Sequence, residues 1–453
     1  MEGTKEVREN KMGVMPENKL LISMAVPMML SMLVQALYNV VDSIFVARIG
    51  EDALTAVSLA FPVQNLMIAM GTGTGVGINA LLSRSLGEKD QKMANKAAHN
   101  GILLMFFSFI LCALFGVFGA RWFFATQTED IALIEYGYQY LSIVLVGSFG
   151  IYGQFITERL LQATGRTLYS MYTQGLGAII NLVLDPILIF GLFGLPAMGI
   201  TGAAVATVAG QIISAMVGLM FNLKKNPDIQ LSIKELKPDG EVIRKIYSVG
   251  VPSIIMGSIG SVMNFGMNQI LMTFSSTAAA VFGVYFKLQS FFFMPVFGLN
   301  NGMVPIIAYN YGAKRKDRML KTIKLSVMYA VGIMLIGFLV MQIFPAQLFG
   351  MFEASESMLA IGVPALRIIS ISFIMAGYCI VSGSVFQALG NGMLSMINSV
   401  ARQLLVLLPV AYLLSLTGEL NMIWWSFPIA ELLSVTLTSI FLYRIYQKTI
   451  KSL

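Results

Sequence analysis

The chain has 453 residues, of which 57% are hydrophobic and only 12% charged, and its formal net charge is +7. Soluble domains carry about 25% charged residues, so this chain has too few polar side chains to coat a water-soluble particle of its size. The composition excludes a soluble globular protein and predicts a chain whose main solvent is lipid.

Twelve apolar segments follow a polar tail at 1–19, and each reaches the length of about 20 residues that a spanning helix needs. Together they predict an all-α polytopic membrane protein with twelve transmembrane helices. In chain order we expect the spans at 20–49, 53–85, 93–118, 131–157, 167–191, 198–222, 242–275, 278–310, 318–343, 358–388, 392–415 and 421–443.

Basic residues alternate between the ends of these spans and predict their orientation. Most of the 30 lysine and arginine residues fall in the two tails and in the connections that follow even-numbered spans, whereas only Arg48 and Arg121 fall on the opposite side. Basic connections stay in the cytoplasm, so we expect a multi-pass monomer in the plasma (cytoplasmic) membrane with both termini inside. The positive charge is then a topology signal, and we expect no nucleic-acid partner.

The two halves of the chain repeat each other with an offset of 225 positions. Matched positions include Val26-Pro27 with Val251-Pro252, Gly73, Gly77 and Gly87 with Gly298, Gly302 and Gly312, and Gln162-Ala163-x-Gly165 with Gln387-Ala388-x-Gly390. Six spans per half predict two pseudo-symmetric six-helix bundles in a parallel repeat, a plan of alternating-access transporters. We expect lobes at 20–222 and 242–443, a cytoplasmic linker at 223–241 and a cytoplasmic tail at 444–453.

Polar side chains inside the first-half spans mark a candidate site, because ionisable groups at membrane depth are costly. Asp42, Asp185 and Thr207 each lie about nine or ten residues from the same side of the predicted bilayer, and Asn181 lies one helical turn before Asp185. Pro186 lacks an N–H and frees a carbonyl one turn back. These oxygens form a pocket suited to a proton or a hard cation.

A switch follows from the two carboxylates. Burial and a second nearby carboxylate both disfavour the charged form of an acid, so such a pair can take up a proton near neutral pH. Pro27 lies on the same helix as Asp42 and offers a hinge, and we expect protonation of Asp42 to bend this helix. The alternative is that Asp42 and Asp185 only link helices.

The second half contains the intramembrane charges Lys287, Arg402 and Glu431, for which we expect a structural cluster in which Glu431 pairs with Lys287 or Arg402, and Arg367, whose side chain can extend to the surface. A substrate cavity between the halves would draw on aromatic, amide and methionine side chains, which suit pliable binding surfaces. Our candidates for it are Tyr38, Asn39, Gln64, Met256, Asn264 and Gln289.

At these positions the sequence resembles the multidrug and toxic compound extrusion (MATE) family over essentially its whole length. The residues that carry the resemblance are Pro27, Asp42, Gly87, Gln162–Gly165, Asn181 with Asp185-Pro186, Gly202–Thr207 and Gln387–Gly390. The resemblance implies a V-shaped antiporter that exports lipophilic organic cations in exchange for protons or sodium ions. It also implies a cation site at Asp42, Asn181, Asp185 and Thr207. Ser261 and Met375 stand where another branch of the family has carboxylates, which places the expected coupling in the first lobe.

Two other classes of function compete with this one. A flippase for a lipid-linked precursor should line its cavity with several cations, but the candidate half is acidic. A membrane-embedded enzyme needs a nucleophile–base pair or a metal cluster; His99 is the only histidine, and Cys112 and Cys379 lie within apolar runs. We therefore expect a transporter that is not an enzyme and has no cofactor or metal beyond its coupling ion.

Overall fold

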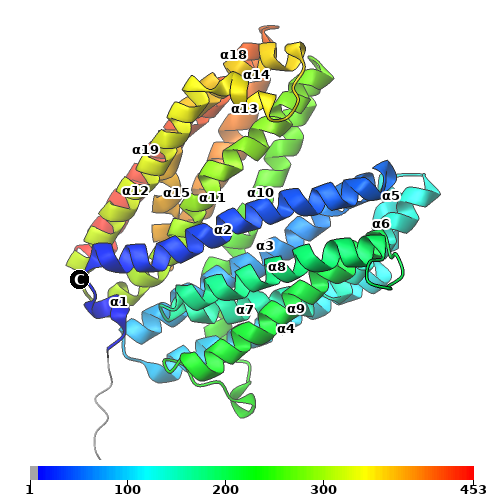
Figure 1. Cartoon of the computed structure of the whole chain (residues 1–453). Helices are drawn as coiled ribbons and strands as arrows, with labels where there is room; N and C mark the ends of the chain where they lie inside the picture. The colour runs from blue at the N-terminus through cyan, green and yellow to red at the C-terminus, as the bar shows by residue number, and fades with distance from the viewer. Residues whose placement is uncertain (1–8) are drawn as a thin grey trace, which may run out of the picture.

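A computed structural model describes residues 9–453, which are almost entirely helical (Figure 1). Eleven segments are long and apolar enough to cross a membrane, and the pair α6 and α7, bent by 42°, makes up to twelve, which confirms the predicted architecture. The spans are α2 (Glu17–Ile49), α3 (Glu51–Gly87), α4 (Gln91–Phe118), α6 (Ile131–Val146) with α7 (Phe149–Ala163), α8 (Thr167–Phe190), α9 (Ile200–Lys225), α10 (Gly240–Met272), α11 (Ser276–Gly312), α12 (Lys316–Ile343), α14 (Glu356–Ile369) with η2 (Ser370–Ser372) and α15 (Phe373–Ala388), α16 (Gly392–Val400) with η3 (Ala401–Leu407) and α17 (Leu408–Ser415), and α18 (Leu420–Trp424) with α19 (Ser426–Ile445) and η4 (Tyr446–Ile450).

The remaining helices are short. They are α1 (Lys11–Val14), α5 (Ala120–Gln127), η1 (Ile233–Glu235) and α13 (Pro345–Gly350). Figure 1 shows the spans in two groups that diverge like the arms of a V, with both ends of the described chain near the point of the V. Each group encloses its own core of buried apolar side chains. We call the groups the first and second lobe, and the point of the V the closed end.

The first helix of each repeat crosses to the other lobe at the closed end. Helix α2 packs along α11 of the second lobe before it reaches α8 of the first lobe, and α10 packs along both α3 and α16. These crossings bury long stretches of backbone against backbone. The seam between the lobes is therefore built from exchanged helices.

Small residues make this close packing possible. A Cβ atom on Gly302 would lie 2.6 Å from the α2 backbone, and one on Gly77 would collide with the carbonyl group of Ile246 on α10. Gly87 and Gly312 occupy equivalent places in the repeat, and a Cβ on either would strike the backbone of the opposite helix. These four glycines, which form two pairs in the repeat, thus lie where helices of the two lobes touch.

The connection between the lobes, residues 226–239, lies along α4 and is bonded to it. Side chains of α4 accept hydrogen bonds from backbone N–H groups of the connection, at 3.0 Å for Asn95 with Gln230, 3.0 Å for His99 with Ser232 and 2.9 Å for Asn100 with Asp239. Lys96 adds an ion pair of 3.1 Å to Asp239, and this half-exposed bond lowers the pKa of the Asp239 carboxyl. The only histidine thus has a structural partner in this segment.

Candidate functional site

Two carboxyl groups meet inside the first lobe. Asp42 on α2 and Asp185 on α8 are neighbours. Asp185 is fully buried, and one oxygen of Asp42 is buried without a hydrogen-bond partner among residues 9–453. An ionised carboxylate can only accept hydrogen bonds, so a bond between two carboxyl groups requires a proton on one of them. A proton on either group would allow the two to form such a bond.

Asn181 connects this pair to two hydroxyl groups. With its amide oriented so that the nitrogen faces the pair, Asn181 donates to Asp185 Oδ2 at 2.8 Å. Its oxygen then lies 2.9 Å from the Tyr38 hydroxyl and 3.1 Å from the Thr207 hydroxyl. The Thr207 hydroxyl also lies 3.0 Å from the carbonyl of Ala203. Three helices, α2, α8 and α9, thus contribute to one buried polar cluster, which we call the acidic cluster.

Glycines bring α9 close enough to α8 for this contact. A Cβ on Gly202 would lie 2.6 Å from the backbone of Leu188, and one on Gly210 would lie 2.7 Å from the Gly177 carbonyl oxygen. Thr207 sits on α9 between these two contact points. The spacing of Asn181 and Asp185 by four residues puts both side chains on one face of α8, which is the face that meets α9.

The four residues predicted to bind the coupling cation, Asp42, Asn181, Asp185 and Thr207, are therefore brought together, and cation binding stays a prediction. Tyr38, which we had assigned to the substrate cavity, is part of the same cluster. Helix α2 continues through Pro27, whose carbonyl accepts a bond from Ser31 at 2.9 Å. A hinge at Pro27 likewise stays a prediction.

The other cavity candidates have separate partners, and no hydrogen bond joins any two of them in the described chain. Gln64 donates to the Tyr140 hydroxyl at 3.1 Å, Asn39 accepts from Gln35 at 3.4 Å, the Met256 sulfur accepts from Gln387 at 3.8 Å, and Gln289 accepts from Tyr285 at 3.2 Å. Asn264 has a buried oxygen without a partner among residues 9–453.

In the second lobe the structure pairs Glu431 with Arg402. Their nearest atoms are 3.1 Å apart, and Glu431 is buried. Of the two predicted partners of Glu431, Arg402 forms the pair, and Lys287 forms no ion pair in the described part of the chain. Tyr285 and Leu288 point into the core, which turns the intervening Lys287 to the exposed side of α11. Arg402 is the second residue of η3, a π-helical stretch in which each backbone hydrogen bond spans one residue more than in an α-helix.

The Arg402–Glu431 pair gives a testable stability effect. We expect Glu431→Ala to lower the free energy of unfolding by about 2 to 3 kcal/mol, since removing one partner of a buried ion pair costs about 3–5 kcal/mol and Arg402 is partly exposed. Thermal unfolding in detergent measures this change. The double variant Glu431→Leu with Arg402→Met should recover most of the loss, and an unchanged unfolding temperature in Glu431→Ala would contradict the structural role.

The sequence analysis missed two buried charges on α7. Glu158 is 2% exposed and accepts hydrogen bonds from Gln154 at 2.9 Å and from Gln174 at 3.0 Å. Arg159 is 9% exposed and donates to Gln162 at 3.2 Å and, across the seam, to Asn301 of α11 at 3.4 Å. The predicted fourth span ends at 157, which places both residues in a connection, whereas α7 continues to Ala163.

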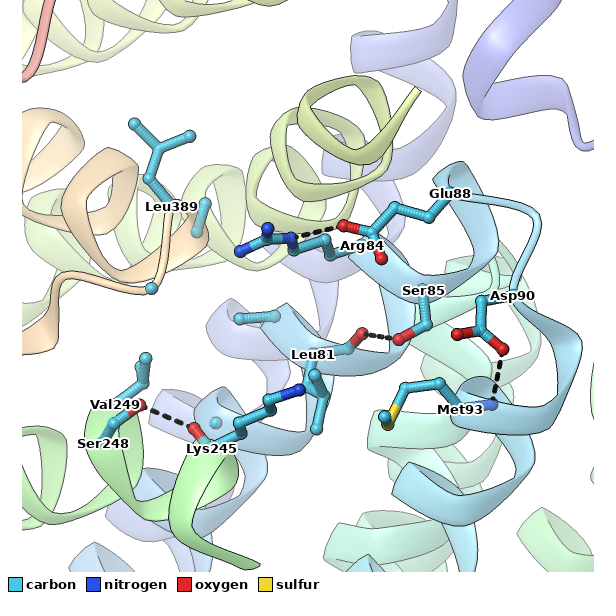
Figure 2. A pocket seen from close by; sticks show the side chains of 14 residues that line it. Leu81, Arg84, Ser85, Glu88, Asp90, Met93, Lys245, Ser248, Val249 and Leu389 are labelled. Carbon is cyan, nitrogen blue, oxygen red and sulfur yellow. Dashed lines mark hydrogen bonds and ion pairs between the residues drawn. The ribbon is translucent and has the colours of Figure 1, made fainter. Parts of the chain in front are cut away.

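A cavity of about 310 Å³ lies at the closed end, between α3, the start of α10 and the turn that joins α15 to α16. Figure 2 shows that its polar side chains already have partners: Arg84 binds Glu88 at 2.8 Å, and Asp90 accepts from the Met93 N–H at 3.0 Å. Lys245 pairs with Glu241 at 3.3 Å. Apolar groups, among them Leu81 and Val249, form much of the wall. No motif in the sequence predicts this cavity.

Known proteins align with this chain over most of its length. The MatE family model matches residues 27–187 and 252–413, and the second match begins 225 residues after the first (252 against 27), as the repeat predicts. Two proteins named multidrug export protein MepA are 26% identical: that of Staphylococcus haemolyticus over 94% of this chain and 93% of its own, and that of Staphylococcus aureus strain MRSA252 over 94% of each.

Solved structures share the fold. A structure described as the outward-facing conformation of a multidrug resistance MATE family transporter of the MOP superfamily superposes with a TM-score of 0.92 at 23% identity, over 98% of this chain and 99% of that one. Both halves of the chain match the family model, most of its length aligns with curated relatives, and its helices follow the same path. The resemblance read from the motifs is thereby confirmed, and the chain belongs to the MatE family of membrane proteins.

Proposed function

We propose that this protein is a secondary active exporter of lipophilic organic cations, which it exchanges for protons or sodium ions by alternating access. The observation that carries the proposal is the acidic cluster, where Asp42 and Asp185 are neighbours inside the first lobe and Asn181 joins Asp185 to Tyr38 and Thr207. Relatives named multidrug export proteins support the export of drugs, and the acidic cluster favours substrates that carry a positive charge. The basic connections and tails support a cytoplasmic location of the closed end.

The acidic cluster has the chemistry of a coupling switch. A proton that bridges the two carboxyl groups holds α2 against α8, and its loss leaves two like charges in a site of low dielectric, where they repel strongly. The helix can then shift away from α8, with Pro27 as the hinge. Binding of a cationic substrate near Asp42 would offset the same negative charge, so substrate and proton would exclude each other.

Sodium can replace the proton in this scheme because Asp42, Asp185, Asn181 and Thr207 all offer oxygen ligands, which hard cations prefer. The carboxyl–carboxyl contact favours a proton, since a sodium ion would have to separate the two groups. We do not propose a pump driven by ATP, because the longest polar connection, residues 226–239, is too short to fold as a domain that hydrolyses ATP.

Transport under imposed gradients tests the proposal. Purified protein in liposomes should move ethidium against its concentration gradient when a proton gradient alone is imposed, and a sodium gradient alone should give little movement. Accumulation with sodium alone would assign the coupling to that ion. Absence of gradient-driven movement with either ion, for several cationic dyes and with correctly inserted protein, would contradict the proposed antiport.

A further inference from the structure

A short helix at the beginning of the described chain lies across the seam at the closed end. Helix α1 is capped by Asn10, whose side-chain oxygen accepts from the Met12 N–H at 3.0 Å. Met12 is fully buried. The helix lies between the turn that joins α7 to α8 in the first lobe and the turn that joins α11 to α12 in the second. We call residues 9–15 the clasp.

The clasp is bonded to the first lobe through Asn10. The Asn10 amide donates to the Thr164 carbonyl at 2.8 Å and to Asp228 at 3.1 Å. Arg166 holds Asp228 in place with an ion pair of 2.5 Å. A Cβ atom on Gly165 would lie 3.4 Å from the Met12 side chain, so the α7–α8 turn forms one wall of a socket around α1.

The clasp is also bonded to the second lobe, through three backbone carbonyl oxygens that accept from one cluster of donors. Arg315 donates to the Gly13 carbonyl, Asn310 to that of Met12 at 2.9 Å, and Arg318 to those of Met12 at 3.1 Å and Met15 at 2.6 Å. Arg315 also forms an ion pair of 2.5 Å with Glu9. Separating the two lobes at this end therefore breaks one set of bonds or the other.

The internal repeat supplies a comparison within the same molecule. Thr164-Gly165 and Tyr309-Asn310 form the socket around α1. Their equivalents in the repeat, 225 positions away, are Leu389-Gly390 and Arg84-Ser85. Leu389, Gly390, Arg84 and Ser85 line the cavity of about 310 Å³ in Figure 2. A Cβ on Gly390 would meet nothing within 4 Å, whereas one on Gly165 meets Asn10, Lys11 and Met12.

This contrast shows what the clasp adds. The lobes are in contact around both places, but among residues 9–453 only the first of the two equivalent sockets is filled by protein. Contact between the lobes therefore does not require a filled socket, and α1 is an additional tie that spans both lobes.

We propose that the clasp holds this end of the transporter shut and must release one lobe each time that end opens. The strength of the clasp then sets the ratio between the state in which this end is open and the state in which it is shut. The inference builds on the alternating access of the proposed function. Release exposes the buried Met12 side chain and leaves the donors of Asn310, Arg315 and Arg318 without their carbonyl partners. The clasp contacts none of the residues of the acidic cluster, so it acts on the conformational equilibrium and leaves the coupling chemistry unchanged.

Distance measurements between the lobes test this role. Spin labels at the exposed positions Lys224 on α9 and Lys324 on α12 would report the separation of the lobes at the closed end by double electron–electron resonance in liposomes. We expect Asn10→Ala, which frees the first-lobe side, and Arg315→Ala, which weakens the second-lobe side, each to raise the ratio of long to short separations by about fivefold, the effect of losing roughly one net hydrogen bond.

A matched control lies in the same turn. Lys316→Ala removes a neighbouring positive charge that bonds only within the second lobe, to the Lys451 carbonyl at 3.2 Å, and it should leave the ratio unchanged. A wild type that samples both separations while neither clasp variant changes their ratio would overturn the clasp. A wild type that never shows the longer separation, at any pH or ethidium concentration, would overturn both the alternating access and the clasp.

Discussion

Asp42→Asn is expected to abolish gradient-driven export while the protein still inserts and folds. The amide can donate a hydrogen bond to Asp185 as a protonated carboxyl does, but it cannot release a proton. The variant is thus held in the proton-loaded arrangement. Without proton exchange no driving force remains, and we expect the accumulation ratio of ethidium in liposomes to fall to about one.

The control for this substitution is Asp52→Asn, which makes the same chemical change at an exposed carboxyl on the first turn of α3. That variant should transport as the wild type does. Asp185→Asn should reproduce the loss, since the scheme needs both members of the pair. Full accumulation by Asp42→Asn would remove the acidic cluster from coupling and would leave only its role in linking α2 to α8.

Gly77→Ala should strongly destabilise the arrangement seen here, although alanine is the better helix former. The added Cβ would collide with the Ile246 carbonyl and lie 3.2 Å from the Gly250 nitrogen, and both belong to a helix backbone that cannot turn away as a side chain can. Overpacking of this kind costs about 1–3 kcal/mol and occasionally more, and we expect about 3 kcal/mol. Thermal unfolding in detergent would measure it.

Gly260→Ala is the matched comparison, because Gly260 also lies inside a long helix, α10, but a Cβ there meets nothing within 4 Å. In an open helix position alanine is favoured over glycine by about 1 kcal/mol, so this variant should unfold at the same or a higher temperature. Equal unfolding temperatures for the two variants would show that the seam tolerates a methyl group and that the glycine contacts are not what keeps the lobes close.

The architecture was predictable because lipid allows few solutions. Backbone groups in a bilayer must be satisfied within the segment, so each long apolar run had to be a helix. The shared offset of residues such as Gly87 and Gly312 revealed the two lobes. Periodicity alone could not show where helices bend. The break between α6 and α7 at Gly147 and Ser148 lies inside an apolar run, and the Gly-Ser pair, a common site of helix kinks, was the available hint.

Part of the acidic cluster was predictable from depth and helical spacing. Asn181 and Asp185 lie one turn apart, and Asp42 could be placed at the same depth by counting residues from the end of its span. Tyr38 could not be assigned to the cluster in this way, because its partner comes from another helix and depends on how α2 is rotated. Its position one turn before Asp42 was the available hint.

Other features depended on packing between distant segments. Glu158 and Arg159 were missed because a charged pair was read as the end of a span, although Gln154 one turn earlier could have signalled a buried polar face. The exclusion of Lys287 from the Arg402–Glu431 pair depends on helix rotation. The clasp was invisible in the sequence, since residues 9–15 are a short segment of mixed polar and apolar residues, and only their contacts with both lobes give them a role.

The exchanged helices at the closed end limit how far the repeat can be divided. Helix α10 follows a connection that is bonded to α4, and α10 itself packs along α3 of the first lobe. Helix α2 packs along α11 of the second lobe in the same way. Each six-helix half therefore depends on a packing partner that the other half supplies. A half made alone would leave that strip of glycine-lined backbone uncovered. Two copies of it would be expected to trade their opening helices with one another, as partners do in domain swapping. The single chain thus has the form of a fused, self-exchanging dimer.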